Sequence, residues 1–485
     1  MEQTGLEQTG AAVRPRAVLL AIAAASLIGV LPIAGLETPA QRTLSILVLV
    51  AVFWLTEALP AWVSALSIPA LATLLGVCDV KRAFTGFGDP IIFLFFGTFL
   101  LTSACFQHGL NARLARSVLT SPFVRGKPVR LLWALSCLAL LISAWVNNTA
   151  TTVMLLPLAL AAQARSRNEH SKEIIPILLV TAYAPSVCGI ATPVGSAPNL
   201  IGLRLIETTT GTAVSFARWC LWFTPLAVLA TALTALYLAR GMRAGSGSSE
   251  LAVNADGLPP PTLAWSRAEK TLVWVCALVI LFWIGPGMLQ SLAVGPAQTL
   301  KTWSSRLPEA VVPLVGGLSL FLLPSDAHGG RILDERVLPR IDWSTLLLFG
   351  GGLTLGSLLF ETGLARWLGE GLFRMLPISG MFGVVLASTL MAVILSEITS
   401  NTASASLVVP IVLSLAKAAG VDPVAPALAA TVACSFGFML PVSTPPNALV
   451  YATGRVPLSA MIRYGILLDI LGVLLISTWV TVLSG

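Results

Sequence analysis

The sequence predicts an all-α polytopic membrane protein, and three observations support that prediction. Of the 485 residues, 56% are hydrophobic and only 11% are charged, whereas a soluble globular chain carries about 25% charged residues. The mean hydropathy is +0.87. Apolar runs of the length that a transmembrane helix needs recur along the whole chain. A membrane β-barrel would instead show segments of about ten residues with alternating polarity.

The apolar runs predict about 11 transmembrane helices, at roughly 20 residues per crossing. The first run has no clear cleavage site and is followed by further spans, so we expect a retained helix. The second run is too long for one crossing, and the Glu57-Ala58-Leu59-Pro60 break divides it into two short helices. The predicted segments are 17–36, 43–77, 90–107, 131–162, 174–199, 219–238, 271–293, 308–323, 343–360, 380–418, 425–452 and 464–483.

Two of these segments have a polar cluster at the centre and are predicted to be re-entrant hairpins rather than crossings. The clusters are Asn147-Asn148-Thr149 and Ser400-Asn401-Thr402. Hydroxyl and amide groups are costly in hydrocarbon unless they find partners. Ser and Thr in membrane helices often bond their own helix or a neighbour, which explains a single hydroxyl but not two such clusters. The clusters therefore predict a cavity that holds a ligand.

The two halves of the chain carry the same features in the same order, which predicts an internal duplication. Each half has a Gly-Leu pair, an Asn-Thr pair and then a helix broken at a Pro-Asn pair, at 191–199 and at 441–447. The offsets between equivalent pairs are 254, 253 and 248 residues. Duplicated broken helices are typical of secondary transporters. The equivalent positions are Gly109 and Gly363, Asn148 and Asn401, and Pro198 and Pro446.

Positive charge sets the expected orientation. If each hairpin returns to the face from which it entered, the N-terminus and most basic loops share one face, which the positive-inside rule assigns to the cytoplasm. The halves are then inverted repeats in a multi-pass protein of the cell inner (plasma) membrane. The predicted organisation is an N-terminal segment with the first helix (1–42), inverted repeat 1 (43–240), a polar cytoplasmic linker (241–268) and inverted repeat 2 (269–485).

Composition also argues against several functions. The net charge of +7 is spread over loops, where Lys and Arg set topology, so no nucleic-acid partner is expected. The seven cysteines are scattered without a CxxC pair and are predicted to be packing residues. No histidine falls in a predicted span and no HExxH or GxSxG motif occurs, so an intramembrane enzyme is a remote alternative. No organic cofactor is expected.

The hairpin tips predict binding of an anion together with a cation. Helix ends at a tip expose N–H groups, which with Asn and Thr side chains suit a carboxylate. Free carbonyls with Ser, Thr or Asn oxygens suit a hard cation such as Na⁺. No Lys, Arg or His lies in either tip or either break. Anion binding would then depend on dipoles and amides, with co-bound cations balancing the charge.

Four motifs in these clusters resemble the divalent anion/Na⁺ symporter family, which contains sodium-coupled dicarboxylate, citrate and sulfate transporters. The resemblance covers nearly the whole chain, excepting about 1–16 and 241–268. The motifs are NNTATTVMLLP (147–157), GIATPVGSAPNLIG (189–202), TSNTASASLVVP (399–410) and FGFMLPVSTPPNALV (436–450).

The resemblance implies a homodimer whose protomers each have a scaffold domain and a mobile transport domain, interleaved between the repeats and moving as an elevator. It implies substrate contacts from Asn148, Thr149, Ser196, Asn401, Thr402, Thr444 and Pro445. It implies one Na⁺ near Ser143, Asn147, Asn148 and Gly195, and another near Ser396, Thr399, Asn401 and Ser443. The chain departs from the family pattern at Asn147, where Ser is usual, and at Ala197, which replaces the first proline of a Pro-Pro pair.

The expected function is Na⁺-coupled import of a divalent anion, most simply a C4-dicarboxylate such as succinate, malate or fumarate. The partners are thus a small anion, the lipid bilayer and a second copy of the chain. A cation-independent dicarboxylate exchanger and a sulfate or citrate transporter are the alternatives within this class. A channel is also an alternative, but inverted broken-helix repeats favour alternating access.

Overall fold

The computed structural model describes residues 15–119, 121, 124, 127–163, 174–243, 264–291, 308–325, 330–375 and 378–484. These residues fold into helices, with one isolated β-bridge between Pro324 and Arg331. Nine helices in this part of the chain are long and apolar enough to cross a membrane. The predicted all-α membrane fold is confirmed. The count of about 11 spans stays a prediction, and most of the predicted 241–268 linker lies outside the described residues.

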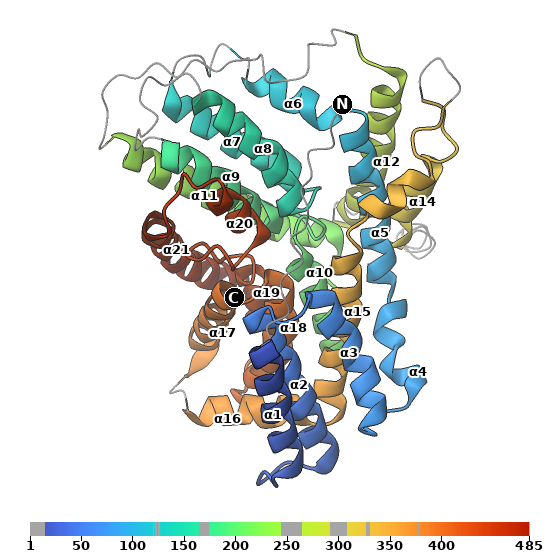
Figure 1. The fold of residues 1–485 in the computed structure, drawn as a ribbon, viewed down its shortest axis with the longest axis vertical. Helices are drawn as coiled ribbons and strands as arrows, with labels where there is room; N and C mark the ends of the chain where they lie inside the picture. The colour runs from blue at the N-terminus through green and yellow to red at the C-terminus, as the bar shows by residue number, and fades with distance from the viewer. Residues whose placement is uncertain are drawn as a thin grey trace.

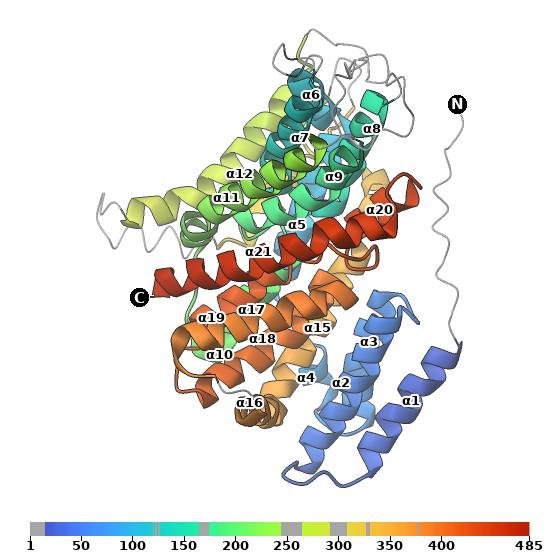
Figure 2. The same cartoon turned by 90° about the vertical axis from the view of Figure 1, so that its left-hand side faces the viewer.

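The first helices form a bundle of their own, at the lower right of Figure 2. They are α1 (Pro15–Val30), α2 (Thr38–Thr56) and α3 (Ala61–Leu74). Between α2 and α3 the chain turns at Glu57, whose φ of 48° is left-handed, and Pro60 then precedes α3. The break predicted here is therefore confirmed. Two short elements follow, α4 (Val80–Ala83) and the 3₁₀ turn η1 (Thr85–Gly88).

Two long helices, α5 (Pro90–Gln107) and α15 (Trp343–Glu361), are built in the same way. Each starts at an aspartate whose side-chain oxygen accepts a first-turn amide, at 3.1 Å for Asp89 and 3.0 Å for Asp342. Such a cap satisfies one of the N–H groups that a helix start leaves unpaired. The two aspartates are 253 residues apart, the same offset that separates the two Asn-Thr pairs.

After each long helix the chain turns at a glycine with a left-handed φ, 73° at Gly109 and 78° at Gly363. The turns lead into two short helices, α6 (Leu110–Leu119) and α16 (Leu364–Met375). Leu110, Ala115, Leu364 and Ala365 on these helices are buried. The search for apolar runs did not find these helices, because each is short and interrupted by charge.

The two segments with polar centres are helical hairpins. The first consists of α7 (Pro128–Ser143) and α8 (Asn148–Gln163), and the second of α17 (Gly380–Ile398) and α18 (Asn401–Ala418). At 1.5 Å per residue, α7 and α8 are each about 24 Å long. That is shorter than the ~30 Å hydrocarbon core of a bilayer. The turns of the hairpins therefore place helix ends inside the protein.

Two helices are broken where the sequence predicts. The first runs as α9 (Ile174–Cys188), the 3₁₀ turn η2 (Gly189–Ala191) and α10 (Ala197–Thr210), and the second as α19 (Val424–Ala433) and α20 (Pro445–Ala452). Proline at the start of α10 and of α20 suits a new helix but cannot continue an old one. Burial reaches 94% over the window that contains α9, which places this helix at the centre of the fold.

The helices form two packing groups, which Figure 1 shows side by side. The first packing group contains α1 to α5, α12, α14 and α15, and the second contains α7 to α11 and α17 to α21. The groups meet where α15 packs against α18 and α10, and where α11 packs against α12. The remaining elements are α11 (Phe216–Arg243), α12 (Arg267–Ser291), α14 (Val311–Ser319), the 3₁₀ helix η4 (Glu335–Arg340) and α21 (Leu458–Ser484).

Candidate functional site

The tips of both hairpins and the breaks of both broken helices meet around one cavity of about 210 Å³. Pockets for drug-sized ligands measure roughly 300–1,000 Å³, so this one suits a small molecule. Phe95 on α5 and Leu348 on α15 also line it, so it lies where the packing groups meet. The cavity brings together all seven residues predicted to contact substrate, namely Asn148, Thr149, Ser196, Asn401, Thr402, Thr444 and Pro445.

Four helices, α8, α10, α18 and α20, begin at this cavity. Three of them are capped by a side-chain oxygen that accepts the amide three residues on, at 2.8 Å for Asn147, 3.3 Å for Ser400 and 3.2 Å for Thr444. At the start of α8 and α18 the other first-turn N–H groups have no partner within their own helix, whereas the prolines that begin α20 have no N–H group. Four helix dipoles therefore direct positive partial charge at the cavity.

The cavity has no fixed positive charge. Of the described residues that line it, none is Lys, Arg or His. The acidic residue in the lining, Asp342, uses both carboxylate oxygens on Thr345, at 3.0 Å to the amide nitrogen and 2.6 Å to Oγ1. An anion here would be held by amides, hydroxyls and helix dipoles, and a cation bound nearby would strengthen that binding.

Asn148 and Asn401 lie at equivalent places in the two tips, and a serine holds each of them. The Ser143 hydroxyl lies 2.9 Å from Asn148 Oδ1, and the Ser396 hydroxyl lies 2.9 Å from Asn401 Oδ1. A side-chain amide has its oxygen and its nitrogen on opposite sides. With the oxygens turned to the serines, the Nδ2 donors of both asparagines remain for the cavity that these residues line.

Oxygen atoms gather on the serine side of each asparagine. Ser143 Oγ also lies 2.8 Å from the Pro185 carbonyl oxygen, and Ser396 Oγ lies 2.7 Å from the Cys434 carbonyl oxygen, so the single hydroxyl proton of each serine faces two oxygens. Each group of hydroxyl, amide and main-chain oxygens is the type of donor set that a hard cation prefers. These two carbonyls could not be predicted as ligands from the sequence, because every residue has a main-chain oxygen. Their only signal was the break in the helix that follows.

The four residues predicted around the first cation do not all contribute free oxygens. Ser143 and Asn148 are adjacent, and Gly195 packs so closely that a Cβ on it would lie 2.7 Å from the Ser143 carbonyl oxygen. Asn147 instead uses its Oδ1 to cap α8. Ser400, the equivalent residue of the second tip, caps α18 in the same way. The asparagine at 147 thus takes the place of a capping serine.

This arrangement predicts a small effect for Asn147→Ser. Serine caps a helix about as well as asparagine does, so the Na⁺ concentration for half-maximal uptake should stay within about twofold of wild type. Asn147→Ala should lower the free energy of unfolding by about 1 kcal/mol, the usual cost of a lost cap. Na⁺ titration of uptake and thermal unfolding measure the two effects. A tenfold weaker Na⁺ response in Asn147→Ser would make the Asn147 oxygen a cation ligand.

The second tip differs from the first because it holds Glu397. The Glu397 carboxylate accepts the amides of Met439 and Leu440, at 2.8 and 3.2 Å, and the Ser443 hydroxyl at 2.7 Å. It thereby fixes the chain that precedes α20. Of the residues predicted around the second cation, Ser443 is thus bonded to Glu397. Thr399 Oγ1 is buried without a hydrogen-bond partner in the described structure, so it is free for a ligand.

Two buried asparagines hold the broken helices in shape. Asn199 Nδ2 donates to two carbonyls of its own break at 2.9 and 2.8 Å, and Asn447 Nδ2 donates to two at 2.9 and 3.0 Å. The Oδ1 atoms of both residues are buried and have no partner within the described ranges. The sequence marked these residues only as parts of Pro-Asn breaks. Their bracing role follows from the carbonyls that a break leaves unpaired.

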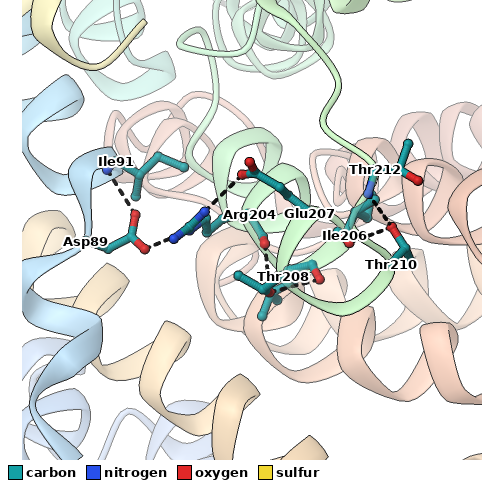
Figure 3. A network of polar contacts seen from close by, with 9 residues as sticks. Asp89, Ile91, Arg204, Ile206, Glu207, Thr208, Thr210 and Thr212 are labelled. Carbon is teal, nitrogen blue, oxygen red and sulfur yellow. Dashed lines mark hydrogen bonds and ion pairs between the residues drawn. The ribbon is translucent and has the colours of Figure 1, made fainter. Parts of the chain in front are cut away.

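A polar network joins the two packing groups at the start of α5 (Figure 3). Asp89 caps α5 through Oδ1, and its Oδ2 accepts Arg204 Nε of α10 at 2.7 Å. Arg204 Nη1 also donates to Glu207 at 3.0 Å. Because Arg204 is about one-third exposed, the pair is partly screened by solvent.

Residues 14–484 match the family described as the sodium:sulfate symporter transmembrane region. The chain belongs to this family. An uncharacterized transporter of Haemophilus influenzae from the same comparison is 32% identical over 456 residues, which are 93% of each chain. The sodium-dependent dicarboxylate transporters SdcS of Staphylococcus saprophyticus and Staphylococcus aureus are each 29% identical over 89% of this chain and 84% of their own.

Solved structures show the same fold at lower sequence identity. The YdaH transporter of Alcanivorax borkumensis has a TM-score of 0.58 at 16% identity, with 96% of both chains covered. MtrF of Neisseria gonorrhoeae has a TM-score of 0.56 at 13% identity, over 95% of this chain and 96% of its own. The resemblance seen in the motifs is thus confirmed. The protein is a multi-pass membrane transporter of the sulfate and dicarboxylate symporter family and not an enzyme.

Proposed function

We propose that the protein imports a C4-dicarboxylate such as succinate, malate or fumarate together with Na⁺. The observation that supports this most is the single cavity between two equivalent tips, each with one asparagine amide and the first turn of a helix. Two separate donor groups suit a ligand with two separate carboxylates. A cavity without a lysine or arginine in its described lining suits an anion that binds together with cations.

The asparagines provide the coupling in this proposal. Oδ1 of Asn148 faces the Ser143 oxygen while its Nδ2 is left for the cavity, and Asn401 repeats the arrangement with Ser396. A Na⁺ on the oxygen side would fix the amide plane and polarise its N–H donors toward the substrate. Each ion would thus pre-organise one half of the anion site, so substrate binds tightly only when Na⁺ is present.

Labelled succinate uptake into proteoliposomes tests this function. Uptake should depend on an inward Na⁺ gradient and should be lost when choline replaces Na⁺. Uptake that is indifferent to Na⁺ but stimulated by internal succinate would instead identify a cation-independent exchanger. Competition by unlabelled sulfate and citrate tests the remaining alternatives, because the preferred substrate should compete at the lowest concentration.

For the transport step we propose an elevator movement, in which the second packing group carries the site across the membrane past the first. The expected assembly is a homodimer in the cell inner (plasma) membrane with the N-terminus in the cytoplasm. Cysteine labelling of the N-terminus in intact cells tests the orientation, and light scattering of the purified protein tests the dimer. The site lies between packing groups that meet through few elements, which supports this movement.

The Asp89–Arg204 pair provides a test of that movement. If α10 moves relative to α5, the pair must break in each cycle, and Asp89→Asn or Arg204→Gln should speed succinate exchange by up to about fivefold. That factor corresponds to the ~1 kcal/mol of a partly exposed pair. Asn still caps α5. The rate increases of the two single variants should not add in the double variant. The control is Arg366→Gln, which breaks an ion pair inside α16 alone and should leave the exchange rate unchanged. Additive effects would contradict the shared pair.

A further inference from the structure

A second carboxylate lies beside Glu397, and nothing in the site described above uses it. Asp469 of α21 is only 4% exposed, and neither of its oxygens has a hydrogen-bond partner among the described residues. Its carboxyl group lies within reach of the Glu397 carboxylate and of the Phe438 backbone. Two buried carboxylates this close cannot both stay charged unless they share a proton or bind a cation.

The packing of α21 holds Asp469 against the unwound chain before α20. One turn before it, Gly465 lies so close that a Cβ would be 2.5 Å from the Phe438 carbonyl, and near the next turn Gly472 packs on the Phe436 ring. Glu397 approaches the same stretch of chain from the other side, through its bonds to Met439 and Leu440. The two carboxylates are therefore fixed next to each other by the backbone around them.

The charge of this pair is not balanced by an ion pair in the part of the chain that the structure describes. No ion pair among the described residues includes Glu397 or Asp469. The other titratable group that faces them is Tyr183 of α9, whose hydroxyl donates to the carbonyls of Phe438 at 2.8 Å and Met461 at 3.2 Å. The oxygens that remain free are those of Asp469 and the unused lone pairs of Glu397, which together form a site for a cation.

The pair occurs in one half of the chain only. The position equivalent to Glu397 in the first tip, 253 residues earlier, is Ala144. The two tips nevertheless share their serine-to-asparagine contacts of 2.9 Å and a side-chain cap at the start of the second helix. Since the first tip reaches the same local structure without an acid, the acid pair is not a requirement of the hairpin fold.

We infer that Glu397 and Asp469 bind a Na⁺ ion, separate from the cations at the two tips. The inference rests on the proposed Na⁺ coupling, and it adds an ion that neutralises the second half of the site. Because Glu397 holds Ser443 and the chain before α20, this ion would stabilise the break that carries Thr444. Binding of this ion would thus stabilise one wall of the substrate cavity, although the ion itself does not contact the substrate.

Na⁺ titration of the purified full-length protein without substrate tests the site, with choline chloride keeping the ionic strength constant. Na⁺ should raise the thermal midpoint of wild type, and Asp469→Asn should reduce that rise. In proteoliposomes the same variant should lower the Hill coefficient for Na⁺ by about one. Ser477→Ala is the matched control, because Ser477 is also buried on α21 without a hydrogen-bond partner in the described structure. It should behave as wild type.

A background that leaves Asp469 intact provides a second test, should Asp469→Asn fail to fold. The double variant Asn148→Ala/Asn401→Ala removes the amide oxygens of both tip sites, so any Na⁺-dependent stabilisation that remains should come from the acid pair. Loss of all Na⁺ response in that background would overturn the inference. The inference would also be overturned if Na⁺ stabilised Asp469→Asn as much as wild type. Asp469 would then be a protonated, neutral acid that binds no cation. The thermal measurements on wild type and on both variants need no transport, so failure of the proposed uptake would be seen separately.

Discussion

Asn148→Ala and Asn401→Ala should each reduce Na⁺-driven succinate uptake to background while the protein is still made and inserted. Each substitution removes a donor to a carboxylate and an oxygen that faces a serine. A hydrogen bond to a charged group contributes about 1.5–3 kcal/mol, so the donor alone accounts for roughly a 10- to 100-fold loss. Loss of the cation oxygen adds to it. Initial rates of uptake and the amount of inserted protein are the measurements.

Aspartate at the same positions separates the two roles of the amide. Asn148→Asp and Asn401→Asp keep an oxygen toward the serine but replace the donor with a charge that repels the substrate. Na⁺ should still stabilise the purified aspartate variants, but succinate should not. In the alanine variants, stabilisation by Na⁺ and by succinate should both be lost at the altered tip. If the aspartate variants still took up succinate, the Nδ2 atoms would not contact it.

A matched control is available in Asn111 of α6. This asparagine is 6% exposed and its Nδ2 has no hydrogen-bond partner in the described structure, yet it lies outside the cavity between the tips. Asn111→Ala should therefore leave uptake and its Na⁺ dependence near wild type. Equal losses in Asn111→Ala and Asn148→Ala would indicate a general effect on packing instead of a binding role.

The polar tips were predictable because polar groups are energetically unfavourable in the hydrocarbon core of a membrane. Asn148, Asn401 and the two Pro-Asn breaks stand out in an apolar sequence, since hydrocarbon tolerates such groups only where they have partners or a ligand. The same reasoning predicted the two breaks, which the structure confirms. The substrate contacts were implied by the family resemblance of the motifs, and the structure places all seven of those residues around one cavity.

Other features could not be predicted because they depend on three-dimensional neighbours. The carbonyls of Pro185 and Cys434 become potential ligands only where the chain folds back on Ser143 and Ser396. The position of Asp469 beside Glu397 could not be predicted, because the sequence does not say that α21 lies against the second tip. Pairing between segments that are far apart in the chain is set by tertiary packing, which hydrophobic periodicity does not encode.

Gly189→Ala should abolish coupling at the first tip without breaking the helix. Gly189 does not have a left-handed φ, so alanine fits its backbone conformation. A Cβ there, however, would lie 2.6 Å from Asn148 Oδ1 and 3.0 Å from the Gly195 carbonyl oxygen. The cation site must therefore open or the Asn148 amide must turn away. Overpacking of this kind costs about 1–3 kcal/mol, so uptake should fall by roughly 5- to 150-fold and the Na⁺ requirement should rise.

Two further glycines make this prediction specific. Gly371→Ala on α16 adds a methyl group where no atom lies within 4 Å, so it should behave as wild type. Gly437→Ala, the equivalent of Gly189 in the second half, would meet the Ser396 carbonyl oxygen at 2.9 Å. The milder clash should give a smaller loss. Wild-type Na⁺ dependence in Gly189→Ala would place the first cation elsewhere, because no ion between Asn148 and Gly195 could tolerate the added methyl group.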